Sequence, residues 1–281
     1  MVTSADVLKI AAFSDGKCGG NPAGVAIGDH LPSPEVMQAI AADIGFSETA
    51  FAAPGDQEHA WVVRYYSPEI EVPFCGHATI ALGAALVLRY GDGVFQLNLS
   101  QADITVEGVH DGDVISAALQ SPPTSSQKAD DVLVTTALGL FGYGADDIDA
   151  RIPPAIADAG GRILILALND RVRLSQMAYD LEVGREVMKA AGVETISLIY
   201  AESNQLFHTR NPFAAGGVYE DPATGAAAAA LAGYLRDINW PHGGCIDIVQ
   251  GEDMGMKSLL RAEILDVAGS SVRVSGAARV M

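Results

Sequence analysis

The sequence predicts an α+β protein of two pseudo-symmetric domains, each a mixed or antiparallel β-sheet wrapped around a central buried helix. Two segments, 76–90 and 225–235, carry almost only small or apolar side chains. A helix without a polar face has to be surrounded by protein on all sides. Short strand patterns flank both segments, and a chain of 281 residues is long enough for two domains.

In the first half, turn residues separate short apolar runs, a pattern that predicts strands. The opening strand is expected at 7–10, and a turn at Asn21–Gly24 leads into another strand. Pro34 opens an amphipathic helix that runs to about Asp43. The apolar side of this helix is expected to carry Val36, Met37, Ile40 and Ala41. Further strands are expected at 48–52, 61–66, 96–99 and 114–118.

Residues 120–131 contain two adjacent prolines and a polar run, which predicts a crossover between the halves. The expected domains are therefore 1–120 and 121–269, and a final strand within 270–281 could complete the first domain. Apolar patterns in the second half predict strands at 162–168, 195–201 and 205–209 and a helix at 180–191. The last strands, near 261–267 and 271–275, could close either sheet.

The composition is that of a globular protein with few basic residues. Hydrophobic residues make up 49% and charged residues 19%, and the formal net charge is −18 with only 17 Lys and Arg. Nucleic acid and anionic membranes are therefore not expected as partners. An anionic substrate would have to be held by local backbone donors and helix ends, because the overall field repels it.

Cysteine usage and the first residues favour a reducing, cytoplasmic location. Cys18, Cys75 and Cys245 have no C-x-x-C spacing, so neither a disulfide framework nor a zinc cluster is expected. Residues 1–13 lack the pattern of an export signal. The longest apolar stretches fall short of the roughly 20 residues that a membrane span needs.

The two buried helices begin in a similar way. Aligned without a gap, their starts read Cys75-Gly76-His77 and Thr224-Gly225-Ala226. A helix N-terminus presents unpaired N–H groups and the positive end of the helix dipole, and glycine lets a ligand come close to them. Two such starts facing one cleft between the domains would bind a carboxylate or a developing enolate. The alternative is that both glycines only permit close helix packing.

Glu48 is the candidate acid/base. In an extended strand its side chain would share a face with Phe46 and Ala50. A carboxylate on an apolar face is suited to take and return a proton near neutral pH. The alternative is a solvated glutamate on an edge strand, and the local sequence alone does not separate the two.

Asp221 and His77 are further candidates at the helix starts. Asp221 followed by Pro222 is typical of a helix N-cap with proline at the first helical position, a role compatible with contact to substrate. His77 in the first helical turn is expected to be neutral and to donate one hydrogen bond, although a buried structural histidine is the commoner role. The remaining histidines lack metal-ligand spacing, so no metal is assigned, and no nucleotide-binding glycine motif is present.

Four segments in order resemble the PhzF-like isomerase family, named for phenazine biosynthesis. They are Gly20-Asn-Pro-Ala23, Ser47-Glu-Thr-Ala-Phe51, Arg64 to Thr79 with the sequence RYYSPEIEVPFCGHAT, and Glu220-Asp-Pro-Ala-Thr-Gly225. The resemblance covers most of the chain. It implies the fold of diaminopimelate epimerase and proline racemase, in which two related domains enclose a substrate cleft. It further implies an enzyme without cofactor and a homodimer.

The resemblance also assigns site residues. It implies that Glu48 shuttles the proton and that Gly76, His77, Asp221 and Gly225 line the pocket. With these positions in view, the catalytic residues predicted are Glu48, Asp221 and His77, and the residues predicted to bind substrate are Asn21, Cys75, Gly76, Thr224, Gly225 and Ala226. The related epimerases use a pair of cysteines, and here Cys75 has Thr224 as its counterpart, so the glutamate mechanism is preferred over a two-thiol mechanism.

One departure concerns the substrate. The family motif usually continues with serine after Gly225, where this chain has Ala226. The missing hydroxyl removes a hydrogen-bond donor, which argues against the phenazine precursor as substrate. The function predicted is a 1,3-proton shift or an epimerisation on a small carboxylate-bearing substrate. The alternatives are a racemase or dehydratase that depends on Cys75, and a ligand-binding protein that keeps the fold without catalysis.

Overall fold

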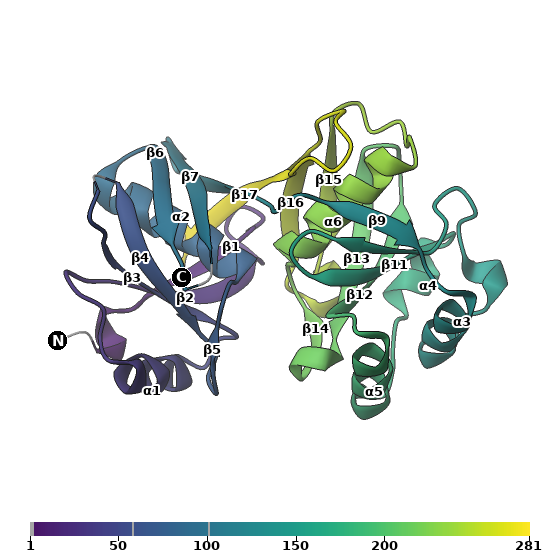
Figure 1. Cartoon of the computed structure of the whole chain (residues 1–281), viewed down its shortest axis with the longest axis horizontal. Coiled ribbons are helices and arrows are strands. Elements are labelled where there is room, and N and C mark those ends of the chain that lie inside the picture. The colour runs from purple at the N-terminus through teal and green to yellow at the C-terminus, as the bar shows by residue number, and fades with distance from the viewer. Residues whose placement is uncertain (1–2, 58, 101) are drawn as a thin grey trace. The chain divides into compact units, whose positions relative to one another are not determined.

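The computed structural model describes residues 3–57, 59–100 and 102–281. The chain forms two compact units (Figure 1), unit 1 with Met1–Gln120 and Ser275–Met281, and unit 2 with Ser121–Val274. Both units combine a mixed β-sheet with a central helix, so the predicted α+β class is confirmed. Among the described residues, no helix is long and apolar enough to cross a membrane.

Unit 1 is a closed barrel. Antiparallel pairs and two parallel pairs connect its strands in the order β1-β2-β3-β4-β6-β7-β8-β17, and β17 pairs again with β1. The strands are β1 (Leu8–Ala12), β2 (Asn21–Ile27), β3 (Thr49–Pro54), β4 (Ala60–Tyr66), β6 (Gly93–Asn98), β7 (Asp103–Asp111), β8 (Val114–Gln120) and β17 (Arg273–Val280). The short β5 (Glu71–Val72) pairs with β4 outside this ring.

Helix α2 (Gly76–Tyr90) lies among these strands and packs against β1, β2, β3, β7 and β8 (Figure 1). Every residue from His77 to Val87 is buried, as the all-apolar sequence predicts. Glycine permits this close packing, because a Cβ at Gly83 would lie 2.6 Å from Val106 Cγ2. The helix therefore fills the barrel and has a fixed position within it.

Helix α1 (Pro34–Ile44) covers one side of unit 1. It starts with Pro34 after Ser33 and ends at Gly45 in the left-handed conformation, φ 72°. Met37 and Ile40 pack against Phe51 in a separate hydrophobic cluster. The expectation for Val36 is wrong, because this side chain lies on the solvent side of the helix and is 38% exposed.

Unit 2 repeats the pairing order of unit 1. From β10 to β16 its pairs run antiparallel, parallel, antiparallel, parallel and antiparallel, as they do from β1 to β7. The strands are β9 (Ser125–Lys128), β10 (Ala155–Asp158), β11 (Arg162–Leu168), β12 (Thr195–Ala201), β13 (Leu206–Phe213), β14 (Val218–Asp221), β15 (Cys245–Gln250) and β16 (Ser258–Glu263). The expected pseudo-symmetry is therefore visible in the order and direction of the strands.

The helices of unit 2 lie on both sides of its sheet. Helix α6 (Gly225–Asp237) packs on β9, β10, β11, β15 and β16, and its position after β14 matches that of α2 after β5. Leu164, Leu166 and Leu198 face a second core that includes Leu138 and Met188. The other helices are α3 (Asp131–Leu140), α4 (Arg171–Ser175) and α5 (Leu181–Ala191), and 3-10 turns span Ser4–Asp6, Ala145–Asp147, Ala214–Gly216 and Glu252–Met254.

Several element predictions need correction. Asn21–Gly24 is not a turn but the start of β2, where Pro22 is tolerated because pairing with β3 begins only at Gly24. The expected crossover contains β9, and neither β7 nor α3 was predicted. The predicted strands near 48–52, 261–267 and 271–275 lie instead at Thr49–Pro54, Ser258–Glu263 and Arg273–Val280.

A pair of matching ion pairs anchors the short strands that precede α2 and α6. Arg64 on β4 donates to Glu71 on β5 through Nε and Nη2, and Tyr66 donates a further hydrogen bond to Glu71 at 3.2 Å. Arg210 on β13 contacts Glu220 on β14, where the two side chains are 8% and 2% exposed. Each chain segment is thus fixed immediately before its buried helix begins.

The ion pair in unit 1 makes stability depend on pH. The hydrogen bonds from Arg64 lower the pKa of Glu71 below its ordinary value, so the pair stabilises the fold above that ordinary value and loses its contribution as the pH falls through the lowered pKa. Glu71→Gln is expected to reduce the free energy of unfolding by about 0.5–1.5 kcal/mol at pH 7. In urea titrations below pH 4.5, the difference between wild type and variant should shrink. Glu69→Gln on the exposed neighbouring turn is the control and should stay within about 0.5 kcal/mol of wild type.

Candidate active site

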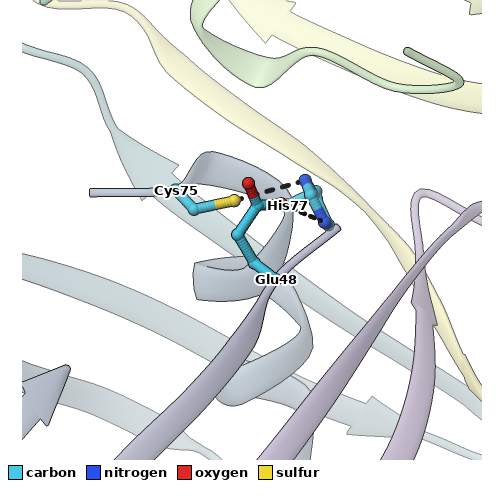
Figure 2. Close-up of side chains that lie close together, drawn as sticks. All are labelled: Glu48, Cys75 and His77. Atoms are coloured by element: carbon cyan, nitrogen blue, oxygen red, sulfur yellow. Dashed lines mark hydrogen bonds and ion pairs between the residues drawn. The ribbon is translucent and has the colours of Figure 1, made fainter. Parts of the chain in front are cut away.

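Three side chains meet at the start of α2: Glu48, Cys75 and His77 (Figure 2). The distance from His77 Nε2 to Glu48 Oε2 is 3.4 Å, and that from His77 Nδ1 to Cys75 Sγ is 3.3 Å. His77 is 6% exposed and the Glu48 side chain 17%. The imidazole therefore lies between a carboxylate and a thiol in a mostly buried cluster that retains access to solvent.

Main-chain geometry brings these residues together. Glu48 lies directly before β3, and its carbonyl accepts a hydrogen bond from Gly24 N on the parallel strand β2 at 3.1 Å. It is therefore at the strand's entry rather than inside a strand with Phe46, which lies in a bend. Cys75 is the N-cap residue of α2, with extended backbone at φ −147° and ψ 119°. Ser47 Oγ lies 3.3 Å from His77 Nε2 and adds a polar contact beside Glu48.

Two buried residues that the sequence analysis did not identify hold the Cys75 backbone. The Thr79 hydroxyl donates to Cys75 O at 2.7 Å, and the Thr79 amide donates to the same oxygen at 3.0 Å. Tyr65 OH lies 2.7 Å from Thr79 Oγ1. Burial raises the pKa of Tyr65, so its phenol stays neutral. A threonine four residues after an N-cap, where it can reach back to the cap carbonyl, is the sequence signal for this support.

Asn21 is the first residue of β2 and is 2% exposed. It pairs with Ala12 on β1 and precedes Gly24, which pairs with Thr49 next to Glu48. Asn21 and Glu48 are therefore at the same edge of the sheet in unit 1, since β2 and β3 are parallel. Its role in binding substrate stays a prediction.

The corresponding helix start in unit 2 has a different chemistry. Thr224 is the N-cap residue of α6, and its hydroxyl donates to Asp221 Oδ2 at 2.5 Å. Asp221 is thus not the N-cap that the Asp-Pro sequence suggested, but the last residue of β14. Gly225 is buried, and Ala226 is partly exposed in the position that His77 has in unit 1. A methyl group therefore stands where the start of α2 has an imidazole.

The sequence of this chain matches a family of known proteins. Residues 10–281 match the phenazine biosynthesis-like proteins, PhzC-PhzF. The chain belongs to this family. Trans-2,3-dihydro-3-hydroxyanthranilate isomerase of Pseudomonas aeruginosa is 30% identical, with 95% of this chain and 94% of the relative covered. An uncharacterized isomerase of Mesorhizobium japonicum is also 30% identical, with 94% and 92% covered.

The fold agrees with that family. The crystal structure of a PhzF-family phenazine biosynthesis protein of Bacillus anthracis superposes with a TM-score of 0.84, covering 98% of this chain and 96% of the other, at 20% identity. The predicted resemblance to PhzF-like proteins is confirmed, and the chain is an isomerase of this family.

Within this PhzF-like protein, Gln250 is a polar residue that the sequence analysis missed. Its side chain, 1% exposed, accepts from Thr224 N at 3.1 Å and donates to Asp221 O at 2.7 Å and to Thr224 Oγ1 at 3.0 Å. Gln250 ends β15, far from Asp221 in sequence, so no local pattern indicates the contact. One amide thereby fixes the whole turn from Asp221 to Thr224.

Replacing Gln250 tests this support. Gln250→Leu leaves Thr224 N and Asp221 O without these partners, and the free energy of unfolding is expected to fall by about 2–4 kcal/mol. Gln250→Glu keeps an acceptor for Thr224 N, but it replaces the donor to Asp221 O by an oxygen and buries a carboxylate, so its loss should be at least as large. Gln127→Leu on the exposed face of β9 is the matched control and should change the free energy by about 0.5 kcal/mol or less. Urea unfolding of the three variants measures the differences, and a loss in Gln250→Leu no larger than that in Gln127→Leu would contradict the assignment.

Proposed function

We propose that this isomerase moves a proton on a small carboxylate-bearing substrate, by a 1,3-shift or an epimerisation, with Glu48 as the acid/base and without a cofactor. The observation that carries the proposal is the partly exposed Glu48 carboxylate beside His77 at the start of a buried helix. A group that transfers protons has to reach both substrate and a polar partner, and Glu48 meets both conditions.

In this mechanism Glu48 removes a proton from a carbon next to the carboxylate or within a conjugated acid. The C–H bonding electrons move into the conjugated system as the Glu48 O–H bond forms. The first-turn N–H groups of α2, which have no acceptor within the helix, stabilise the charge that develops on oxygen. In a 1,3-shift Glu48 then returns its proton to a conjugated carbon, and its carboxylate is restored. In an epimerisation a partner group delivers a proton to the opposite face of the same carbon, and proton exchange with solvent restores Glu48 and that group.

His77 holds the carboxylate in position for this step. Its Nε2 lies 3.4 Å from Glu48 Oε2 and 3.3 Å from Ser47 Oγ, while burial within α2 restricts the ring. A side chain held in this way loses less entropy when substrate binds. His77 therefore supports the orientation of Glu48. We also propose that His77 contacts the substrate directly.

The proposal extends to the second helix start. In unit 2 we assign Asp221 to catalysis and Thr224, Gly225 and Ala226 to substrate binding. In unit 1 we assign Asn21, Cys75 and Gly76 to substrate binding. The rigid turn held by Gln250 supports this assignment, because a fixed hydroxyl and fixed amides bind a carboxylate better than mobile ones. The acidic composition requires such neutral donors. A homodimer in the cytoplasm remains the expectation for the assembly and location.

Exchange with solvent tests the role of Glu48. The protein is incubated with a panel of amino and cyclic acids in deuterated water, and deuterium at carbon is followed by NMR and mass spectrometry. Glu48→Gln is expected to reduce the exchange rate at least about 100-fold, because the group that moves the proton is gone. Glu194→Gln is the matched control, since the exposed Glu194 precedes β12 as Glu48 precedes β3. Exchange retained in Glu48→Gln would remove Glu48 from this role.

A second candidate function is a racemase or dehydratase that depends on Cys75. The distance of 3.3 Å between Cys75 Sγ and His77 Nδ1 favours it, because a neighbouring imidazole activates a thiol. Cys75→Ser separates the two mechanisms. Loss of exchange in Cys75→Ser together with full exchange in Glu48→Gln would favour the thiol, and the proposal above requires the reverse. Saturable ligand binding without exchange in wild type would indicate a non-catalytic binding protein.

A further inference from the structure

The cluster at the start of α2 has the composition of a transition-metal site. Glu48, Cys75 and His77 each offer one ligand atom, and these atoms all lie within 4.8 Å of one another. We propose that the cluster binds a thiophilic divalent cation of the Zn²⁺ type, and that the bound cation withdraws Glu48 from proton transfer. The site was not expected from the sequence, because Glu48 lies far from Cys75 and His77 along the chain.

The donor set suits zinc. Thiolate, imidazole and carboxylate are the usual zinc ligands, and three protein ligands leave a fourth position open. Ligand bonds of about 2.0–2.3 Å place neighbouring donors about 3.3–3.8 Å apart in a tetrahedral site. Sγ and Nδ1 already lie 3.3 Å apart. His77 provides one nitrogen to a given ion. Because the three ligand atoms lie within 4.8 Å of one another, a rotation of the partly exposed Glu48 side chain completes the set.

The surroundings hold two of the ligands and admit an ion. Tyr65 and Thr79 fix the backbone of Cys75, and α2 fixes His77, as supporting contacts do around metal ligands. Cys75 and Glu48 are partly exposed, so an ion can enter from solvent. The positive end of the helix dipole opposes a cation, but two anionic ligands and a net charge of −18 offset this effect.

The ligand chemistry also sets selectivity. A thiolate binds Zn²⁺, Co²⁺ or Cd²⁺ far better than Mg²⁺ or Ca²⁺, which prefer oxygen ligands.

A carboxylate bound to the cation cannot accept a proton from substrate. Cation binding does not depend on the proposed function, whereas inhibition by the cation rests on it.

Cobalt titration of the whole chain tests binding directly, because Co²⁺ bound to a thiolate shows a charge-transfer absorption band. The expected result is a saturable band at one Co²⁺ per chain that Zn²⁺ removes and Mg²⁺ leaves unchanged. Cys75→Ser should abolish the band. Glu48→Gln should keep the band with an affinity at least about 100-fold lower, because loss of a direct ligand costs more than loss of an outer partner. Cys245→Ser is the control and should keep the full band, because the Cys245 thiol lies on β15 beside Arg261 and outside the cluster. Circular dichroism verifies that each variant is folded.

The absence of a thiolate band in wild type, or its persistence in folded Cys75→Ser, would overturn the site. The exchange assay supplies a separate readout: Zn²⁺ should slow deuterium incorporation at least about 10-fold, and a chelator should restore it. A cobalt band without loss of exchange would contradict the inhibitory role alone. A cobalt band in a protein without any exchange would instead support the metal site and reject the proposed function.

Discussion

The burial of one apolar helix inside the barrel of unit 1 is the constraint on which the candidate site depends. Because α2 has no polar face, the strands that surround it fix its axis and its end point. The N-terminus of α2 carries Cys75 and His77 to the position where β3 begins, and there Glu48 meets them. A polar cluster is thus oriented by apolar packing, and the glycine at position 83 permits the close helix contact that this packing requires.

The two units share strand order and helix position but not the chemistry of the helix start. Glu194 and Thr195 enter β12 as Glu48 and Thr49 enter β3, yet Ala226 stands where unit 1 has His77. Unit 2 instead has a threonine that bonds to an aspartate and a buried glutamine that holds both. One copy of the repeat thus carries the residues assigned to proton transfer, and the other carries a rigid set of neutral donors.

Much of the fold could be predicted because the longest apolar runs in the sequence form the helix and strands that are most deeply buried. The apolar runs predicted α2 at Gly76–Tyr90, β11 at Arg162–Leu168 and β12 at Thr195–Ala201 with the bounds that the structure has. The polar strand β7 and the start of β2 could not be predicted, since pairing with neighbours rather than side-chain pattern makes them strands. Local sequence also identified Glu48, Cys75 and His77 singly, whereas Gln250 and the shared ligand geometry arise only from contacts distant along the chain.

Because of strand β17, the closure of the unit 1 barrel depends on the order in which the chain is synthesised. The ring of strands in this unit closes only when residues near Val280 pair with Ile10. All of unit 2 has to be translated before that pairing can form, because Ala278 to Val280 follow unit 2 in the chain, so the barrel around α2 cannot close earlier in synthesis. Loss of only the last few residues of this sequence would therefore damage the amino-terminal barrel first, although the missing segment lies at the opposite end of the chain.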